Sequence, residues 1–388
     1  MSVWDELTGQ SEAIAIFRAA AEASEAGGSN DSSMTHAWLI TGPAGSGRSN
    51  LAYAFATALL SDGNVDGDES VRAQVAARSH PDLSVLSTDR IIITVDEVRK
   101  LAASSYYSPS VGRYRVIVVE DADRMMERSS NALLKALEEP PPRTVWILCA
   151  PSEADLLPTI RSRVRSVRLR IPAVDDVAQL IARRDGVDLP TATRAAREAQ
   201  SHIGMAHRLA TNDEARARRA ETLEIALGIR SVSGAMLAAT RLLALAGADA
   251  SALTEERDAE ERASALRSLG IEPGGTIPPA LRVQLKNLEE DQKRREKRSL
   301  RDGIDRIMVD LLSLYRDILL MQLGVESEPI NLSIYPQLVR ASEQSTAQET
   351  LATMDAIATA RRRIESNVTP ALALEAMLIS ARRSGTAA

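Results

Sequence analysis

Hydrophobic positions in the first 170 residues fall into short continuous runs, separated by segments with helical spacing. Such runs suit strands of a parallel sheet, because helices cover both faces of the sheet and bury every side chain. Four runs are predicted to be strands: residues 36–41, 80–86, 115–121 and 144–149. Helical patterns lie between them, as at residues 51–60. This alternation predicts an α/β domain with a mainly parallel sheet.

The pattern changes after Pro172, beyond which no strand is predicted. Three short helical patterns follow, at residues 174–184, 190–201 and 204–210. From residue 213 the pattern is mostly helical, with a loop rich in glycine and proline at residues 270–279. A charged segment at residues 284–301 predicts a solvated helix. Seven apolar residues then repeat at helical spacing and predict one buried face: Ile304, Ile307, Met308, Leu311, Tyr315, Ile318 and Leu319.

These changes predict three domains: an α/β domain at residues 1–171, a small three-helix unit at 172–212, and an all-α domain at 213–388. Two helix starts carry local signals. Thr94 followed by Glu97 forms the pattern of a capping box, and Pro370 suits the first turn of a final helix. A helix at residues 129–142 is expected to stop at its prolines, which cannot continue the hydrogen-bond ladder.

Composition narrows the class of protein. The chain has 388 residues, a hydrophobic content of 44% and a net charge of −6, which argue for a globular protein and against a generic nucleic-acid binder. A single cysteine, Cys149, excludes an internal disulfide and a cysteine-cluster metal site. No apolar run is expected to approach the roughly 20 residues of a membrane span, and no secretory signal is evident. We therefore expect a cytoplasmic protein that does not interact with membranes.

Residues 42–50 have the spacing of a phosphate-binding loop between a strand and a helix. The loop is predicted to bind phosphate through five positions: Gly42, Gly45, Gly47, Arg48 and Ser49. Backbone N–H groups of such a loop surround phosphate oxygens, and the helix N-terminus adds a favourable dipole. Arg48, however, stands where the pattern requires lysine, and a planar guanidinium does not replace a compact ammonium group.

Two acids, Glu120 and Asp121, end the predicted strand at residues 115–121. A nucleotide-binding fold places its Mg²⁺ ligand and its water-activating acid at this position. A strand followed by a helix cap would show the same pattern. The phosphate loop upstream favours the interpretation as a nucleotide site.

These motifs together resemble the bacterial clamp-loader family of AAA+ ATPases. Residues 5–10 (DELTGQ) resemble its N-terminal motif, and residues 131–141 (NALLKALEEPP) are similar to a specific clamp-loader signature. Residues 159–163 (TIRSR) resemble the stretch that holds the family's Ser-Arg-Cys motif, with Val164 in place of the cysteine. The resemblance covers roughly residues 5–170, and it implies a helical lid and an oligomerising collar for the remainder.

The chain departs from the family pattern at several positions. Besides Arg48, the acidic box Asp-Glu-Ala-Asp reads Glu-Asp-Ala-Asp, so that Glu120 is one methylene too long and Asp121 one too short. Ala150 stands at the sensor position, where a Thr or Asn would contact the γ-phosphate. Residues 61–79 contain no cysteine, so no zinc module and no metal site are expected. No cofactor is assigned; weak binding of ATP or ADP is compatible with the loop.

The resemblance therefore implies a subunit of the delta-prime type, a scaffold within the DNA polymerase III holoenzyme that does not hydrolyse ATP. Its retained active group would be Arg163, an arginine finger that enters the ATP site of a neighbouring subunit. Arg161 and Arg165 are adjacent candidates for the same role. The implied partners are the gamma/tau and delta subunits and, through the complex, the sliding clamp and primed DNA. The alternative is an ATP-hydrolysing motor subunit of the gamma/tau type.

Overall fold

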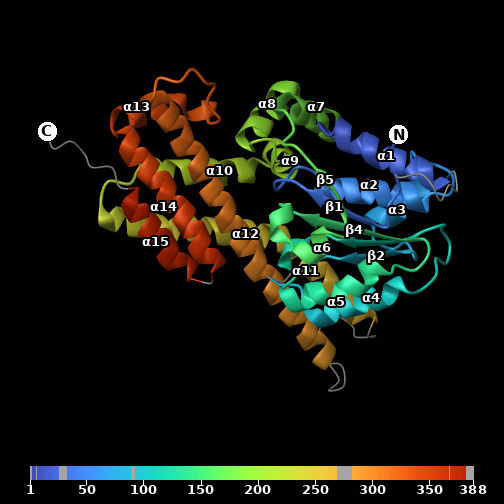
Figure 1. Ribbon diagram of the computed structural model, residues 1–388. Helices are drawn as coiled ribbons and strands as arrows, with labels where there is room; N and C mark the ends of the chain where they lie inside the picture. Colours follow the sequence, from blue (N-terminus) through green and yellow to red (C-terminus); the bar gives the residue numbers. More distant parts are fainter. Residues whose placement is uncertain are drawn as a thin grey trace. The chain divides into compact units, whose positions relative to one another are not determined.

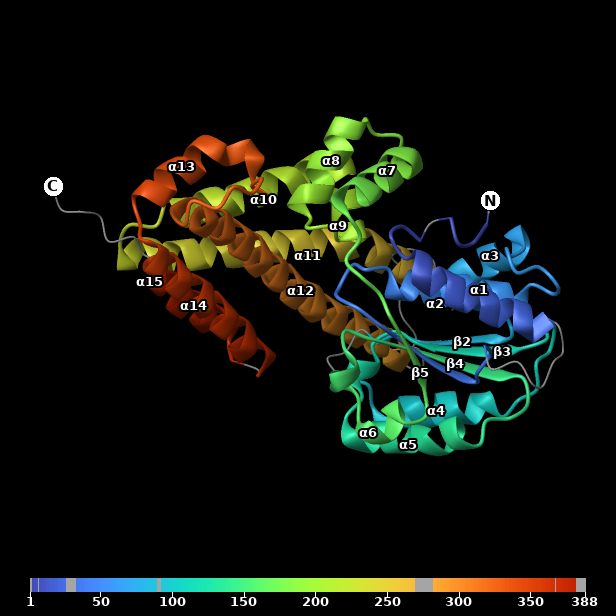
Figure 2. The ribbon, with the colours of Figure 1, turned by 45° about the horizontal axis from the view of Figure 1, so that its top comes forward.

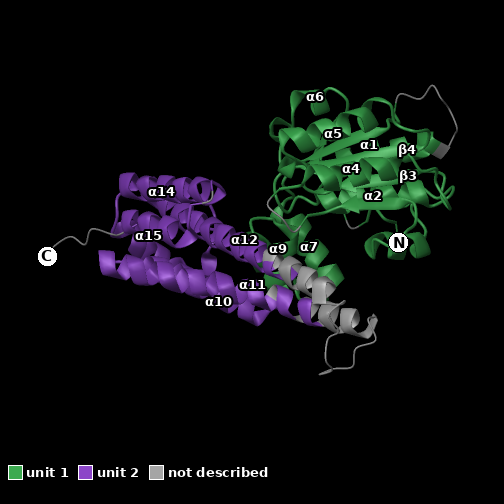
Figure 3. Ribbon diagram, turned by 90° about the horizontal axis from the view of Figure 1, so that it is seen from below, with its two compact units in different colours: residues 1–211 green, residues 212–388 purple. Residues whose placement is uncertain are grey.

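A computed structural model describes residues 2–5, 7–25, 33–88, 92–268, 282–366 and 368–381. The chain divides into two compact units, residues 1–211 and 212–388, coloured separately in Figure 3. Residues 172–211, expected to be a separate three-helix domain, lie in the first unit, so the three-domain division stays a prediction.

The first unit is built on a sheet of five parallel strands in the order β2-β3-β4-β1-β5 (Figure 2). The strands are β1 (Ala37–Thr41), β2 (Leu83–Leu86), β3 (Arg115–Val119), β4 (Thr144–Ala150) and β5 (Arg165–Arg168). All four predicted strands are confirmed, although β2 begins three residues later than expected. β1, β3 and β4 are the interior strands and are buried along their whole length, which explains their uninterrupted apolar sequences.

Helices cover both faces of the sheet (Figures 1 and 2). On one face lie α1 (Ser11–Glu25), α2 (Arg48–Leu60) and α3 (Glu69–Ala76). On the other lie α4 (Val95–Ser105), α5 (Glu127–Glu138) and α6 (Pro158–Arg161), with the short 3₁₀ turns η1 (Ala122–Arg124) and η2 (Glu153–Asp155). The first core centres on three aromatic rings, those of Phe17, Trp38 and Phe55, whose centroids lie 4.7–5.6 Å apart. The predicted α/β fold is thus confirmed.

Two helix ends illustrate how sequence sets these boundaries. Thr94 and Glu97 form the predicted capping box at the start of α4: Thr94 N–H donates to Glu97 Oε2 at 2.8 Å, and Glu97 N–H donates to Thr94 Oγ1 at 3.4 Å. α5 runs from Glu127 to Glu138, so it begins two residues earlier than expected and stops before the prolines, as predicted. A residue that precedes proline disfavours the helical conformation, which moves the end of the helix upstream.

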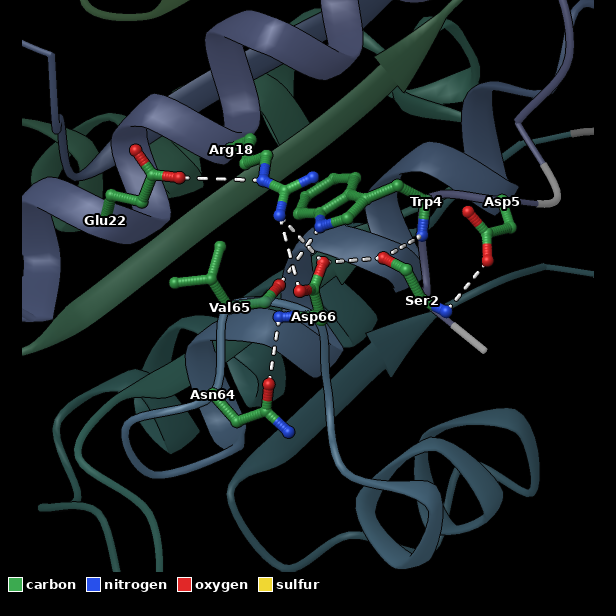
Figure 4. A network of polar contacts seen from close by, with 8 residues as sticks. All are labelled: Ser2, Trp4, Asp5, Arg18, Glu22, Asn64, Val65 and Asp66. Carbon is green, nitrogen blue, oxygen red and sulfur yellow. Dashed lines mark hydrogen bonds and ion pairs between the residues drawn. The ribbon is translucent and has the colours of Figure 1, made fainter.

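The N-terminal segment is fastened to the first unit by a polar network (Figure 4). The indole N–H of Trp4 donates to the carbonyl oxygen of Val65 at 3.0 Å, and the hydroxyl of Ser2 donates to Asp66 at 2.8 Å. Arg18 on α1 pairs with the same Asp66 at 3.0 Å. These contacts tie the first residues, α1 and the loop before α3 together, and they fix the start of the chain beside the sheet.

Three short helices complete the first unit: α7 (Val174–Asp185), α8 (Leu189–Glu198) and α9 (Ile203–Thr211). They confirm the three helical patterns predicted after Pro172. We call α7–α9 the lid.

Every regular element among the described residues of the second unit is a helix. Its elements are α10 (Asp213–Leu227), α11 (Val232–Ser268), α12 (Arg282–Gln322), η4 (Leu332–Ile334), α13 (Tyr335–Glu343), α14 (Ala347–Glu365) and α15 (Pro370–Ser380). Of the seven apolar residues predicted as a buried face, six are buried and Leu319 is half-buried. Pro370 opens the last helix as predicted, and the charged segment at 284–301 is helical. The predicted loop at 270–279 lies outside the described residues.

One segment of the second unit corrects an expectation. Val232–Ala252 in α11 is long and apolar enough to cross a membrane, judged by length and composition alone, whereas no such segment was expected. Its side chains Ala235, Leu242 and Ala246 are buried in the core of the second unit. A core helix of a helical bundle passes the same test of length and composition.

A buried polar network crosses the second unit. Arg219 on α10 donates to Asp310 on α12 at 3.0 Å and to the amide oxygen of Asn331 at 2.6 Å. Asn331 in turn donates from its backbone N–H to Asp317 at 2.9 Å. Because all of these groups are buried or nearly so, each relies on the others for its hydrogen bonds.

Candidate nucleotide site and arginine finger

The phosphate loop connects β1 to α2 as its sequence predicts. Gly47 caps α2 in a left-handed conformation (φ 91°), which glycine adopts without strain. The helix begins at Arg48, so the backbone N–H groups at its start face the loop. The local fold of a phosphate cradle is therefore present.

Arg48 uses its charge within the loop itself. Its guanidinium Nη1 donates to the carbonyl oxygen of Gly42 at 2.5 Å. The side chain therefore folds back across the loop that carries it. A lysine at this position in a working loop reaches forward to the β- and γ-phosphates, whereas this arginine is engaged by its own backbone.

The lid covers the same loop at Gly45. The imidazole of His202 lies so close that a Cβ built on Gly45 would meet His202 Cγ at 2.3 Å. The backbone N–H of Ile203 donates to the carbonyl oxygen of Gly45 at 3.4 Å. His202 is itself oriented by the N–H of Met205, which donates to its Nδ1 at 3.2 Å. The lid thus touches the phosphate loop through a side chain and through the backbone.

The first acid of the acidic box is bound to two neighbouring side chains. The hydroxyl of Tyr53 on α2 donates to Glu120 Oε1 at 2.5 Å, and Arg78 Nη2 contacts the same oxygen at 2.9 Å. The Glu120 side chain is only 14% exposed. Burial, followed by the hydrogen bond to Glu120, raises the pKa of Tyr53 above its usual value. A carboxylate held in this way is a poor candidate for a Mg²⁺ ligand.

The other two predicted positions contribute little to nucleotide chemistry. Asp121 lies beside Arg124, whose Nε is 3.8 Å from Asp121 Oδ2. Ala150 is the last residue of β4, pairs with Thr41 of β1 and is fully buried, with only a methyl group as its side chain. Among the described residues, no group of three or more His, Cys, Asp or Glu side chains is arranged to hold a metal ion.

Arg163 follows the short helix α6 and is held on three sides. Its Nη1 donates to the carbonyl oxygen of Thr159 at 2.7 Å and to the hydroxyl of Ser162 at 3.0 Å. Its Nη2 forms an ion pair with Glu138, at the end of α5. The neighbouring Arg161 is exposed, and Arg165 lies over the ring of Trp38 and donates to the carbonyl oxygen of Ser33.

Arg163 and the phosphate loop lie at opposite ends of two neighbouring strands. Arg163 precedes β5, whereas the loop follows β1, and these two strands are parallel neighbours. The four residues of β5 alone span about 13 Å at roughly 3.3 Å per residue. The structure therefore does not bring Arg163 to the chain's own phosphate loop, although it brings together the predicted loop residues from 42 to 49.

Gln10 is one of several residues whose role the sequence analysis missed. Its amide N–H donates to the carbonyl oxygens of Ser46, at 3.3 Å, and Arg170, at 2.7 Å, and its oxygen accepts from Arg170 N–H at 3.1 Å. Gln10 thereby joins the N-terminal motif to the phosphate loop and to the chain leaving β5. A groove of about 910 Å³ runs beside it, lined by α1, β5, Pro43 and Pro151.

The other missed residues differ in the signal that they left in the sequence. Glu138 lies inside the signature at residues 131–141 and could have been noticed there. Tyr53 sits one helical turn after Ser49, so its position on α2 pointed to the site. His202 gave no signal, because its contact with Gly45 joins residues far apart in the chain.

The parallel sheet, the phosphate loop and the acidic strand end define a P-loop domain of the AAA+ class. A family model described as "DNA polymerase III, delta subunit" matches residues 25–173. Residues 25–173 are thus similar to the clamp-loader subunits of DNA polymerase III.

Individual relatives fall into two types. The DNA polymerase III subunit delta' of Pseudomonas aeruginosa is 35% identical over 154 residues, which make up 38% of this chain and 47% of that protein. The gamma/tau subunit of Mycobacterium tuberculosis is 32% identical over 155 residues, 39% of this chain and 27% of that protein. The alignments thus span about half or less of these relatives' own lengths. A gamma subunit-related protein from Thermotoga maritima covers 94% of this chain and 98% of its own, with a TM-score of 0.41 and 16% identity.

Proposed function

We propose that this chain is a delta-prime-like subunit of a clamp loader, one that does not hydrolyse ATP and supplies Arg163 to a neighbouring motor subunit. Its partners would be the gamma/tau and delta subunits, and the complex would place a sliding clamp on primed DNA in the cytoplasm. The observation that carries the proposal is the contrast between two sites. Arg163 is present before the start of β5, whereas Glu120 of the chain's own acidic box is bound by Tyr53 and Arg78.

The physical reason concerns positioning. Phosphoryl transfer depends on a correctly placed metal ion and water, and a displaced acid raises its barrier. Glu120 would have to leave two partners to bind Mg²⁺, and Arg48 would have to leave Gly42 to reach a phosphate. Arg163 lies away from the chain's own phosphate loop and is one-third exposed, so it is placed to act on another subunit's nucleotide. An arginine finger in trans contributes on the order of 10³–10⁵ to the rate in other phosphoryl-transfer systems.

The alternative is a motor subunit of the gamma/tau type, since relatives of that type match a stretch of similar length at comparable identity. The two functions differ in one measurable property. A motor subunit hydrolyses ATP by itself, or at its own site in the complex, whereas the proposed scaffold does neither.

The test is reconstitution with the motor and delta subunits, followed by ATPase assays. We expect no turnover by the isolated chain. In the complex, Arg163→Ala should lower total ATP turnover by at least the fraction that the site facing Arg163 contributes. Assembly of the complex should be unchanged. Arg161→Ala is the matched control, because Arg161 is exposed and adjacent. Vigorous hydrolysis by the isolated chain, or an assembled Arg163→Ala complex with full activity, would refute the proposal.

A further inference from the structure

Glu138 and Arg163 form an ion pair that joins two separate motifs. Glu138 is the eighth residue of the signature at residues 131–141 and lies at the C-terminal end of α5. Arg163 lies 25 residues further along the chain, just after α6. The neighbouring acid, Glu139, is exposed and points to no basic partner among the described contacts. The pairing is therefore specific to one of two adjacent glutamates.

The pair is accessible to an incoming ligand. The Arg163 side chain is 33% exposed and that of Glu138 is 46% exposed. Ion pairs at such exposure are weak, because water screens the attraction and two long side chains lose freedom. The remaining contacts of Arg163, to Thr159 and Ser162, come from neutral oxygens. The carboxylate of Glu138 is thus the anion that a phosphate would have to replace.

We propose that Glu138 is a positioning residue that holds Arg163 against its own chain until a neighbouring subunit presents a nucleotide triphosphate. This inference rests on the proposed function of Arg163. The guanidinium fork binds carboxylate and phosphate oxygens by the same geometry, so the two anions compete for it. While Glu138 is bound, its charge offsets that of Arg163 and weakens the field that stabilises the transition state. Removal of the Glu138 charge should therefore free the finger.

The first test uses the isolated full chain and needs no partner. Phenylglyoxal modifies accessible guanidinium groups, and mass spectrometry of peptides measures the rate at Arg163. We expect Glu138→Gln to speed modification of Arg163 several-fold, whereas Glu139→Gln leaves it as in the wild type. An unchanged rate in Glu138→Gln would overturn the inference, whatever the ATPase assays show.

The second test uses the reconstituted complex. Glu138→Gln should raise kcat for ATP hydrolysis by up to about five-fold, which corresponds to about 1 kcal/mol, while KM stays constant. A merely structural role would instead lower the yield of complex or its activity. The double variant Glu138→Gln/Arg163→Ala should match Arg163→Ala alone. A rise in kcat that persists in the double variant would overturn the inference, because the effect would not pass through Arg163.

Failure of the inference and failure of the proposed function give different results. If Arg163→Ala leaves the complex fully active, the proposed function fails and the catalytic consequence of the Glu138 pair fails with it. If Arg163→Ala is impaired but Glu138→Gln behaves as the wild type in both assays, only the role of Glu138 is refuted.

Discussion

Tyr53 and Glu120 are joined by a hydrogen bond of 2.5 Å that ties the helix after the phosphate loop to the end of β3. Arg78 approaches the same carboxylate oxygen and also lies 5.8 Å from the centre of the Tyr53 ring. The three side chains form one cluster where a working ATPase binds Mg²⁺. The candidate nucleotide site therefore departs from the family pattern in its contacts as well as in the lengths of its acids.

Restoring the loop lysine alone is expected to fail. In Arg48→Lys, Glu120 keeps its two partners and His202 still covers Gly45, so ATP affinity should stay as weak as in the wild type. Adding His202→Ala should open the loop and improve ATP affinity about ten-fold or more, since a charge-assisted hydrogen bond to phosphate contributes about 1.5–3 kcal/mol. Fluorescence anisotropy of a labelled ATP measures both. Tight binding by Arg48→Lys alone would show that the lid contact does not obstruct the loop.

Tyr53→Phe should destabilise the first unit by about 1–3 kcal/mol, because it leaves the nearly buried Glu120 with one partner fewer. All three tryptophans of the chain, Trp4, Trp38 and Trp146, belong to residues 1–211, so tryptophan fluorescence in urea reports on this unit alone. Tyr106→Phe is the matched control, since that ring is half exposed. Equal shifts in the two variants would argue against a specific role for the Tyr53 hydroxyl.

Asp82 should make the stability of the first unit depend on acid pH. Its buried carboxylate accepts hydrogen bonds of 2.6–2.8 Å from the N–H groups of Ser110, Val111 and Gly112 and from the Ser110 hydroxyl. Burial alone raises the pKa of Asp82, but these hydrogen bonds outweigh it and lower the pKa to about 2, against an ordinary value of 3.8.

The sign follows from linkage, because a depressed folded-state pKa stabilises the protein wherever the unfolded carboxyl is ionised. The contribution is fully present above about pH 4 and is lost as the pH falls towards 2. Asp82→Asn should remove this dependence and cost about 1–3 kcal/mol at neutral pH. Urea titrations between pH 2 and 7 measure it, with the exposed Asp62→Asn as control. A pH dependence that persists in Asp82→Asn would assign it to another group.

Arg219→Met should destabilise the second unit by about 3–5 kcal/mol, because it leaves Asp310 and Asn331 buried without their cationic partner. The second unit contains no tryptophan, so its unfolding is followed by far-ultraviolet circular dichroism. The tryptophan transition of the first unit should not shift and serves as the internal control. We expect the two units to unfold independently. A shift of both transitions together would contradict this expectation.

Local patterns predicted most of the fold. Interior strands such as β3 and β4 were predicted from their uninterrupted apolar runs, and the capping box at Thr94 predicted one helix start. Boundaries were less accurate, as at α5, which begins two residues before its expected start, although it stops ahead of Pro140 because proline disfavours the helical conformation of the preceding residue. The alanine-rich start of α11 was misjudged, because small apolar residues suit a helical core and a membrane span alike.

The candidate site was predicted in its parts but not in its contacts. The spacing of glycines identified the loop, yet no local pattern shows that Arg48 turns towards Gly42 or that His202 lies over Gly45. Such contacts depend on the packing of segments far apart in the sequence. The Glu138–Arg163 pair is of the same kind, since each residue was visible in its own motif and only the fold joins them.

Gln10 pairs with the backbone of the chain where it leaves β5, the strand at one edge of the sheet. Its side-chain amide donates to and accepts from the backbone of Arg170, two residues after the edge strand β5. Unpaired edges recruit other chains and cause aggregation. The N-terminal motif therefore contacts the end of this edge as well as the phosphate loop. Loss of the amide would leave the N–H and carbonyl groups of Arg170 without this partner and would lengthen the exposed edge.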